Sequence, residues 1–514
     1  MTELTQQEQV QQDDVNKAVW AACDAFRGGI EPSTYKDYIL TMLFVKYISD
    51  VHKHEHSKLM EQHKNNEKLV DAMMAKQRFV LPKNASFWDL YKQRAEAGNG
   101  ERIDLALEAI ENANGSKLKN VFQDISFNSD KLGDEKTKNQ RLGAVLEAFG
   151  KKELDLSPAR VGKLDIIGNA YEFLIKHFAA GSGKSAGEFY TPPEVSDLLA
   201  QLLDPQPGDT ICDPACGSGS LLLKCGALVR ENHDSKNYEL YGQEAIGGTW
   251  ALAKMNMFLH GEDNHRIEWG DTLNNPKLTE DDNQKLMSFD IVTANPPFSL
   301  DKWGHENAAK DKFARFHRGV PPKTKGDYAF LSHMVETIAP KDHGLLGGRV
   351  GVVVPHGVLF RGAAEGKIRK QLIDDGLLDA VIGLPEKLFF GTGIPAAILI
   401  FKKKKSDDKV LFIDASRAFK AGKNQNQLTE QNIKDVLEAY KNRVFKDKYA
   451  YLADLDEIIE NDYNLNIPRY VDTFEEEAEV DLVEVRKERL ALQSLLADLE
   501  TDMTKYLKEL GYAL

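Results

Sequence analysis

The sequence predicts an α/β protein built on a doubly wound, mostly parallel sheet of seven strands with a terminal antiparallel hairpin. Three observations support this fold class. Apolar strand patterns alternate with helical patterns between residues 210 and 401, which is typical of a parallel sheet with crossover helices. The last two strand patterns are separated only by a short glycine-containing loop, so they should pair as a hairpin. Residues 13–150, before the sheet, show mostly helical periodicity.

Composition indicates a soluble protein of more than one domain. The 514 residues are 42% hydrophobic and 28% charged, which is ordinary for a globular protein with a large core. Only four cysteines are present, and no apolar run approaches the roughly 20 residues that span a bilayer. We therefore expect a cytoplasmic protein without membrane contact. The formal net charge of −14 means that any nucleic-acid role requires a local basic patch or a partner.

The chain is expected to form three parts. Residues 1–155 would be a helical N-terminal domain, residues 156–470 the α/β domain that carries the chemistry, and residues 471–514 a helical tail. In the tail, apolar residues recur at alternating steps of three and four, as in a coiled coil that needs a surface to pack on. The histidines near residues 52–63 are better explained as a solvated helix end than as ligands, so no metal site is predicted.

Glycine-bearing and proline-bearing turns mark the first two candidate site segments. Thr191 is a good N-cap, with Pro192 as the first helical residue, so a helix should begin there. An aromatic pair, Phe189 and Tyr190, lies just upstream. Residues 210–220 read as a strand, a glycine turn and a helix start, where bare backbone can approach a ligand. The dinucleotide pattern is incomplete because position 222 is leucine.

Four successive strands end in polar or glycine-bearing turns, which contain Asp213, Glu244, Asp271 and Asn295. In a parallel sheet these turns meet at one edge. The fourth turn, Asn-Pro-Pro-Phe at residues 295–298, offers a side-chain amide, proline-flanked carbonyls and an aromatic ring. This set could grip a planar group that bears an exocyclic amine. Taken alone, the same residues fit a plain strand-to-loop turn equally well.

In this order, the motifs resemble those of S-adenosylmethionine-dependent, N6-adenine DNA methyltransferases with a Rossmann-like sheet. The helical N-terminal region, the Gly-Glu-Phe-Tyr-Thr-Pro motif at 187–192, the segment 464–470 and the helical tail further resemble the modification subunit of type I restriction–modification systems. The resemblance covers nearly the whole chain. It implies S-adenosylmethionine as the cofactor and adenine in double-stranded DNA, flipped out of the helix, as the substrate.

The resemblance also implies a role for each motif. Glycine-loop and strand-end residues would hold the cofactor, and the fourth turn would hold the target amine, with Phe298 stacked on the base. The implied cofactor-binding residues are Glu188, Phe189, Tyr190, Thr191, Pro192, Pro193, Asp213, Gly217, Ser218, Gly219, Ser220, Glu244 and Asp271. The implied catalytic residues are Asn295, Pro296, Pro297 and Phe298.

No independent basic DNA-reading domain is evident after Phe401. In agreement, the resemblance implies a separate DNA-specificity subunit, a second copy of this chain, and in some assemblies a restriction subunit. The chain alone should then bind cofactor but methylate DNA poorly. Two other functions remain open at this point: a protein-glutamine methyltransferase, which uses a similar turn, and a catalytically silent cofactor-binding scaffold.

The segment 301–325 is lysine- and arginine-bearing and poorly periodic. It is expected to be a mobile loop, either in contact with a phosphate backbone or merely solvated.

Overall fold

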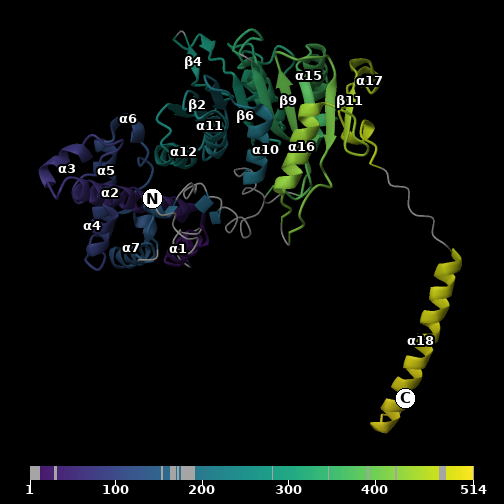
Figure 1. Cartoon of the computed structure of the whole chain (residues 1–514), viewed down its shortest axis with the longest axis horizontal. Coiled ribbons are helices and arrows are strands. Elements are labelled where there is room, and N and C mark those ends of the chain that lie inside the picture. Colours follow the sequence, from purple (N-terminus) through teal and green to yellow (C-terminus); the bar gives the residue numbers. More distant parts are fainter. Residues whose placement is uncertain are drawn as a thin grey trace. The chain divides into compact units, whose positions relative to one another are not determined.

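The computed structural model describes residues 12–27, 30, 32–151, 154–161, 169–170, 173–174, 191–280, 282–344, 346–389, 393–422, 425–473 and 482–512. The chain forms two compact units, residues 1–471 and 472–514, shown in Figure 1. Among the described helices, none has both the length and the apolar content that crossing a bilayer requires.

The N-terminal region is helical, as predicted. The apolar positions of its first helix, Val15, Val19 and Ala22, are fully buried, and the aromatic face of the second helix lies in the same core. That face is therefore packing surface. The elements of this region are α1 (Gln12–Asp24), α2 (Pro32–Gln62), α3 (Glu67–Met74), α4 (Phe87–Lys92), α5 (Asn99–Ala113), α6 (Gly115–Leu118), η1 (Asp130–Leu132), α7 (Glu135–Phe149) and α8 (Pro158–Val161).

A nine-stranded sheet forms the centre of the first unit, in the order β11-β10-β8-β9-β7-β6-β1-β2-β3. Strands β3, β2, β1, β6 and β7 run parallel to one another. The next strand in the sheet, β9, pairs antiparallel with both β7 and β8. The bounds are β1 (Thr210–Asp213), β2 (Glu239–Glu244), β3 (His265–Trp269), β6 (Ile291–Ala294), β7 (Arg349–Pro355), β8 (Leu378–Gly383), β9 (Ala396–Lys402), β10 (Val410–Asp414) and β11 (Ala450–Ala453). A separate small pair consists of β4 (Thr279–Glu280) and β5 (Lys285–Leu286).

The doubly wound sheet and its β8–β9 hairpin confirm the predicted fold class, but the strand number of seven was too low. The sheet continues beyond the hairpin with β10, parallel to β8, and β11, antiparallel to β10. Both lie beyond residue 401, where the strand patterns in the sequence end. Strand β10 has only four apolar residues beside a lysine-rich stretch, and β11 is equally short. Such segments carry little periodicity, so packing against the existing sheet determines their structure.

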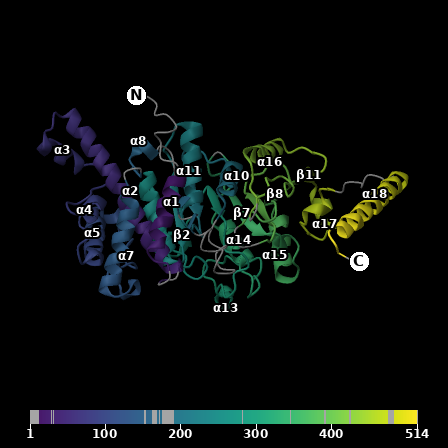
Figure 2. The same ribbon diagram turned by 90° about the horizontal axis from the view of Figure 1, so that it is seen from below.

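Helices cover both faces of the sheet (Figure 2). One face packs against α10, α11, α12 and α16, and the other packs against α14 and α15. Their bounds are α10 (Pro193–Leu203), α11 (Ser220–His233), α12 (Gly247–His260), α14 (Asp327–Glu336), α15 (Ala363–Asp374) and α16 (Glu430–Asn442). Shorter elements are α13 (His305–Ala308), η3 (His356–Leu359), α17 (Leu455–Glu460) and η4 (Ile467–Arg469). Apolar side chains cover both faces of the sheet, so the polar side chains lie at the ends of the strands.

The second unit is the single helix α18 (Leu482–Glu509). Except for Leu507, which is partly buried, its described large apolar side chains are at least 48% exposed, including Leu492, Leu499 and Met503. Because these leucines are exposed, burial of apolar surface does not stabilise the helix. The apolar positions predicted from the sequence are therefore available to pack against another surface.

Candidate active site

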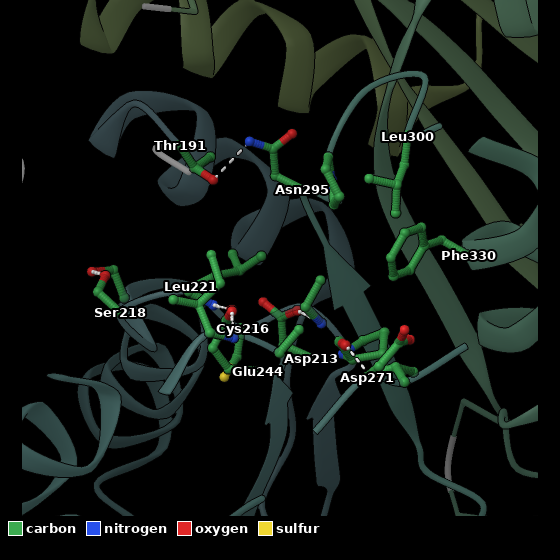
Figure 3. Close-up of a pocket in the computed structure, with 18 of the residues that line it drawn as sticks. Thr191, Asp213, Cys216, Ser218, Leu221, Glu244, Asp271, Asn295, Leu300 and Phe330 are labelled. Carbon is green, nitrogen blue, oxygen red and sulfur yellow. Dashed lines mark hydrogen bonds between the residues drawn. The ribbon is translucent and has the colours of Figure 1, made fainter. Parts of the chain in front are cut away.

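The predicted turn at residues 295–298 lies at the carboxyl end of β6, between β1 and β7. Strand β6 is entirely buried, and it ends where two prolines remove the backbone donors that a ladder needs. The Asn295 Nδ2 atom donates a hydrogen bond to Thr191 Oγ1 at 3.0 Å (Figure 3). Asn295 Oδ1 is buried and has no hydrogen-bond partner within the described residues. Thr191 therefore fixes the amide so that its acceptor oxygen remains available.

A cavity of about 290 Å³ lies at this edge of the sheet. In Figure 3, Asn295 lies on one side of the cavity, and Asp213, Glu244 and Asp271 lie on the opposite side. Most of its lining residues come from the ends of β1, β2 and β6 and from the turn after β3, as expected for the carboxyl edge of a parallel sheet, and the others come from the segment before α10, from α10, α11 and α14, and from the loop after β6. The lining residues are Thr191, Ser196, Asp213, Pro214, Ala215, Cys216, Gly217, Ser218, Ser220, Leu221, Glu244, Ala245, Ile246, Asp271, Thr272, Asn295, Pro297, Leu300 and Phe330.

The glycine turn after β1 forms the loop beneath this cavity. Gly217 and Gly219 have φ values of 54° and 79°, a left-handed conformation that favours glycine. A Cβ atom on Gly219 would lie 2.7 Å from Met257 Cε, so the position also lacks space for a side chain. The loop is held from α12, where Asn256 Nδ2 donates to the carbonyl oxygen of Ser218 at 3.2 Å. These contacts allow the loop backbone to approach a ligand closely.

Two buried carboxylates form the floor of the cavity. Asp213 Oδ1 accepts a hydrogen bond from the Ala215 amide at 2.9 Å. Glu244 accepts from the amides of Gly217 (3.0 Å) and Ile246 (2.8 Å). Burial raises the pKa of Asp213 to about 8, against the Ala215 hydrogen bond, and the neighbouring Glu244 charge adds to the rise. Burial also raises the pKa of Glu244, opposed by its backbone hydrogen bonds and by the charge of Lys36. Among the described lining residues, no lysine, arginine or histidine balances either carboxylate.

Asp271 is organised by its own turn. Its Oδ1 atom accepts from the amides of Leu273 (2.8 Å) and Asn274 (3.1 Å), and its Oδ2 atom accepts from Asn274 Nδ2 (2.7 Å). A carboxylate has about four acceptor positions, so a further donor can still bind. Asp271 thus presents a fixed acceptor at the rim of the cavity.

The charge of the cavity is one-sided. Its described lining contains three acidic residues and no lysine, arginine or histidine. Opposite charges attract strongly where water is excluded, and like charges repel. The cavity therefore suits a ligand with net positive charge better than one with phosphates.

Most of the predicted site residues that the structure describes line this cavity. They are Thr191, Asp213, Gly217, Ser218, Ser220, Glu244, Asp271, Asn295 and Pro297. Four others, Pro192, Pro193, Gly219 and Pro296, support the loops around it without lining it. Glu188, Phe189 and Tyr190 lie outside the described residues. Phe298 is half-buried beside the cavity and makes an edge contact with Phe389, with ring centroids 5.6 Å apart.

Sequence reasoning missed several apolar lining residues. Ile246 lies two positions after Glu244, the acidic residue that ends β2. Its closeness to that predicted site residue could have identified it from the sequence. Leu300 and Phe330 come from a loop and from α14, and no local pattern connects them to the site. Asp327 was also missed: it accepts a hydrogen bond from the Ser299 amide at 2.7 Å and pairs with Arg361 at 3.0 Å. It thereby anchors the chain directly after the turn at residues 295–298.

The segment 301–325 is partly packed. Arg315 and Arg318 are buried, whereas Lys302, Lys310, Lys312 and Lys323 are exposed, so contact of this segment with a phosphate backbone stays a prediction. Trp303 and Phe316 are buried in a small core of their own. Arg315 is 3% exposed and donates to the carbonyl oxygens of Thr272 (3.0 Å) and Leu273 (2.7 Å). It also pairs with Asp311 at 2.7 Å. The guanidinium group of Arg315 thus finds its hydrogen-bond partners within the protein. It supports the turn that contains Asp271 and does not face solvent.

The sequence and structure were compared with known proteins. The profile described as N-6 DNA Methylase matches residues 162–479, and the profile described as HsdM N-terminal domain matches residues 15–149. The type I restriction enzyme MpnII methylase subunit of Mycoplasma pneumoniae is 31% identical, over 92% of each chain. The MjaVII methylase subunit of Methanocaldococcus jannaschii is 34% identical, over 87% of this chain and 77% of that one.

A crystal structure of the type I restriction-modification methyltransferase subunit from Streptococcus thermophilus is 36% identical, with a TM-score of 0.77. The match covers 90% of this chain and 100% of that one.

The sheet order and the cavity at its carboxyl edge define a Rossmann-like methyltransferase preceded by a helical domain. More particularly, the chain belongs to the N-6 DNA methylase family, as a methylase subunit of the type I restriction enzymes. The family resemblance inferred from the motifs is confirmed.

Proposed function

We propose that this chain transfers a methyl group from S-adenosylmethionine to the N6 amine of adenine in DNA. The observation that carries the proposal is the Asn295 amide, whose Nδ2 is held by Thr191 while its Oδ1 is buried without a partner among the described residues. A buried acceptor without a donor is costly. An amine placed at this edge of the cavity would supply the missing donor.

The cavity also fits the proposed cofactor. S-adenosylmethionine carries a sulfonium and an ammonium against a single carboxylate, and the charged residues in the described part of the cavity lining are all acidic. Glu244 and Asp271 would accept hydrogen bonds from the ribose hydroxyls and the adenine amine. The loop of Gly217 and Ser218 would lie against the methionine part, together with Asp213. When bound, the cofactor supplies an activated methyl group on sulfur, with a neutral thioether as the leaving group.

The chain's own residues would then act mainly by positioning. Asn295 Oδ1, with the carbonyl of Pro296, would accept hydrogen bonds from the N6 amine and turn its lone pair toward the methyl group. Phe298 would stack on the extruded base, with Phe389 supporting its edge. As the new N–C bond forms, the C–S bond breaks, and the surplus amine proton leaves to water. In-line placement of reacting groups can supply a large part of such a rate enhancement.

We further propose that DNA sequence is read by a separate specificity subunit, with a second copy of this chain in the complex. The net charge of −14 is unfavourable for holding DNA alone. The exposed apolar side chains of α18 offer a surface for assembly. A restriction subunit would join only where cleavage is required.

The test is methyl transfer by the assembled complex, purified with its partners from the native host. With radiolabelled S-adenosylmethionine, label should appear in DNA as N6-methyladenine, and Asn295→Ala should abolish it while cofactor binding persists. Asn442→Ala, at an exposed position on α16, is the matched control and should be fully active. Label in protein glutamine, or an active Asn295→Ala complex, would refute the proposal.

A further inference from the structure

Helix α12 contributes to two hydrophobic cores of the first unit, that of the sheet and that of the N-terminal helices. Its residues Ala253 and Met257 pack in the core beneath the sheet. Leu252, Met255 and Phe258 are buried in the core of the N-terminal helices instead. Any displacement of the helical region must therefore move α12 or break one of the two cores.

The same helix supports the cofactor cavity at two points. It begins directly after Glu244, Ala245 and Ile246, all of which line the cavity. About two and a half turns farther along the helix, Asn256 is fully buried and donates to the carbonyl oxygen of Ser218 in the glycine loop. A small shift of α12 would thus change the position of both the ribose carboxylate and the loop.

Charged residues from the helical region meet the start of α12. The N-cap residue Ile246 provides no side-chain cap, so the first amides of the helix lack that partner. A Cβ atom on Gly248 would lie 3.2 Å from Asp37 Oδ2, and one on Gly247 would lie 2.8 Å from Asp124 Oδ2. The two glycines therefore allow two carboxylates to approach the positive end of the helix dipole, where negative charge is stabilising.

Lys36 lies beside Asp37, the first of these carboxylates. Its side chain is 23% exposed, and its Nζ lies 3.8 Å from Asp37 Oδ1. Its positive charge also acts on Glu244, where it favours the ionised carboxylate against the larger effect of burial. A residue of the N-terminal helices thus contributes to the electrostatics of the ribose acceptor.

We propose that Lys36 and Asp37 are positioning residues for the cofactor, and that α12 couples the docking of the helical region to occupancy of the cavity. The inference rests on the proposed function, since it assumes that the cavity binds S-adenosylmethionine. Because coupling is reciprocal, cofactor binding should also tighten the contact between α2 and α12.

The test uses the full chain and titrates S-adenosylmethionine by calorimetry. Lys36→Gln and Asp37→Asn should each raise the Kd about three- to tenfold, the size expected for one charge at a partly buried helix end. Lys36→Arg keeps the charge and should restore binding. Lys58→Gln changes an exposed lysine on the same helix and serves as the control. Unfolding temperatures without cofactor should match across the set.

Two further measurements separate positioning from simple loss of structure. Cofactor should slow amide exchange in α2 and at the start of α12 in the wild type, and less so in Lys36→Gln. In the assembled complex, kcat at saturating cofactor should stay within about twofold while KM for the cofactor rises. Unchanged Kd in both variants would overturn the coupling. A wild-type chain that binds no cofactor would overturn the proposed function, and the coupling with it.

Discussion

The hydrogen bond between Thr191 and Asn295 links the start of α10 to the turn at residues 295–298, across 104 residues of sequence. Replacing Thr191 with valine keeps the shape of the side chain and removes only the hydroxyl. Asn295 Nδ2 then loses the partner that orients the amide, and the side chain can rotate its oxygen away from the amine. The change leaves the prolines of the turn and the cofactor carboxylates in place.

The size of the expected fall in kcat follows from the single hydrogen bond that is lost. A hydrogen bond of this kind contributes about 1 kcal/mol, and an unsatisfied buried amide costs a similar amount. If that energy holds the amide in its productive orientation, its loss corresponds to a fall in kcat of about five- to tenfold. A displacement of the turn by about 1 Å would lower the rate further, by about a hundredfold.

Single-turnover methylation by the assembled complex measures this effect directly, and a separate titration gives the cofactor Kd. Thr191→Ser retains the hydroxyl and should keep most of the wild-type rate. The reasoning would be refuted if Thr191→Val methylated at the wild-type rate, or if Thr191→Ser lost as much activity as Thr191→Val.

Three other substitutions test the surroundings of the site. The pKa of Asp213 is raised from 3.8 to about 8, so the native state retains a proton that the unfolded chain releases, and stability should fall as pH rises from about 4 to 8. Asp213→Asn should remove that loss, worth up to about 5 kcal/mol, and denaturant unfolding at pH 5 and pH 9 would detect a flatter pH dependence. Gly219→Ala places a Cβ atom 2.7 Å from Met257 Cε, at a residue with a positive φ. Cofactor affinity, measured by calorimetry, should fall at least about tenfold. Unchanged affinity would show that the loop can adjust its conformation to the side chain. Arg315→Met leaves two carbonyls without a donor and removes the ion pair with Asp311, whose carboxylate keeps only the backbone amide of residue 315. Urea unfolding should show a loss of about 3 kcal/mol, and a neutral result would mean that water replaces the guanidinium.

The strand-end turns could be predicted because their signals are local. Prolines after a β-branched run end a strand wherever it lies, and alternating strands and helices place successive strand ends at one edge. Asp213, Glu244 and Asn295 were therefore grouped from the sequence alone, and the structure brings them around one cavity.

Contacts between distant segments could not be predicted in this way. Nothing near Thr191 indicates that its hydroxyl meets Asn295, and nothing near Arg315 indicates that two backbone carbonyls of another loop surround it. A basic residue in an irregular segment has the same local pattern whether it faces solvent or a buried carbonyl. The short strand β10 was missed for a related reason, because its pairing with β8 is decided by the sheet and not by its four apolar residues.

The one-sided charge of the cavity has a consequence for competition among ligands in a cell. ATP and NAD share an adenosine group with S-adenosylmethionine, and the ribose acceptor Glu244 alone would not distinguish them. Their phosphates, however, would have to approach the carboxylates of Glu244 and Asp271 with no described lining cation to neutralise them. The same acidic residues that would attract a sulfonium would therefore exclude the abundant nucleotides, so discrimination comes from repulsion as well as from fit.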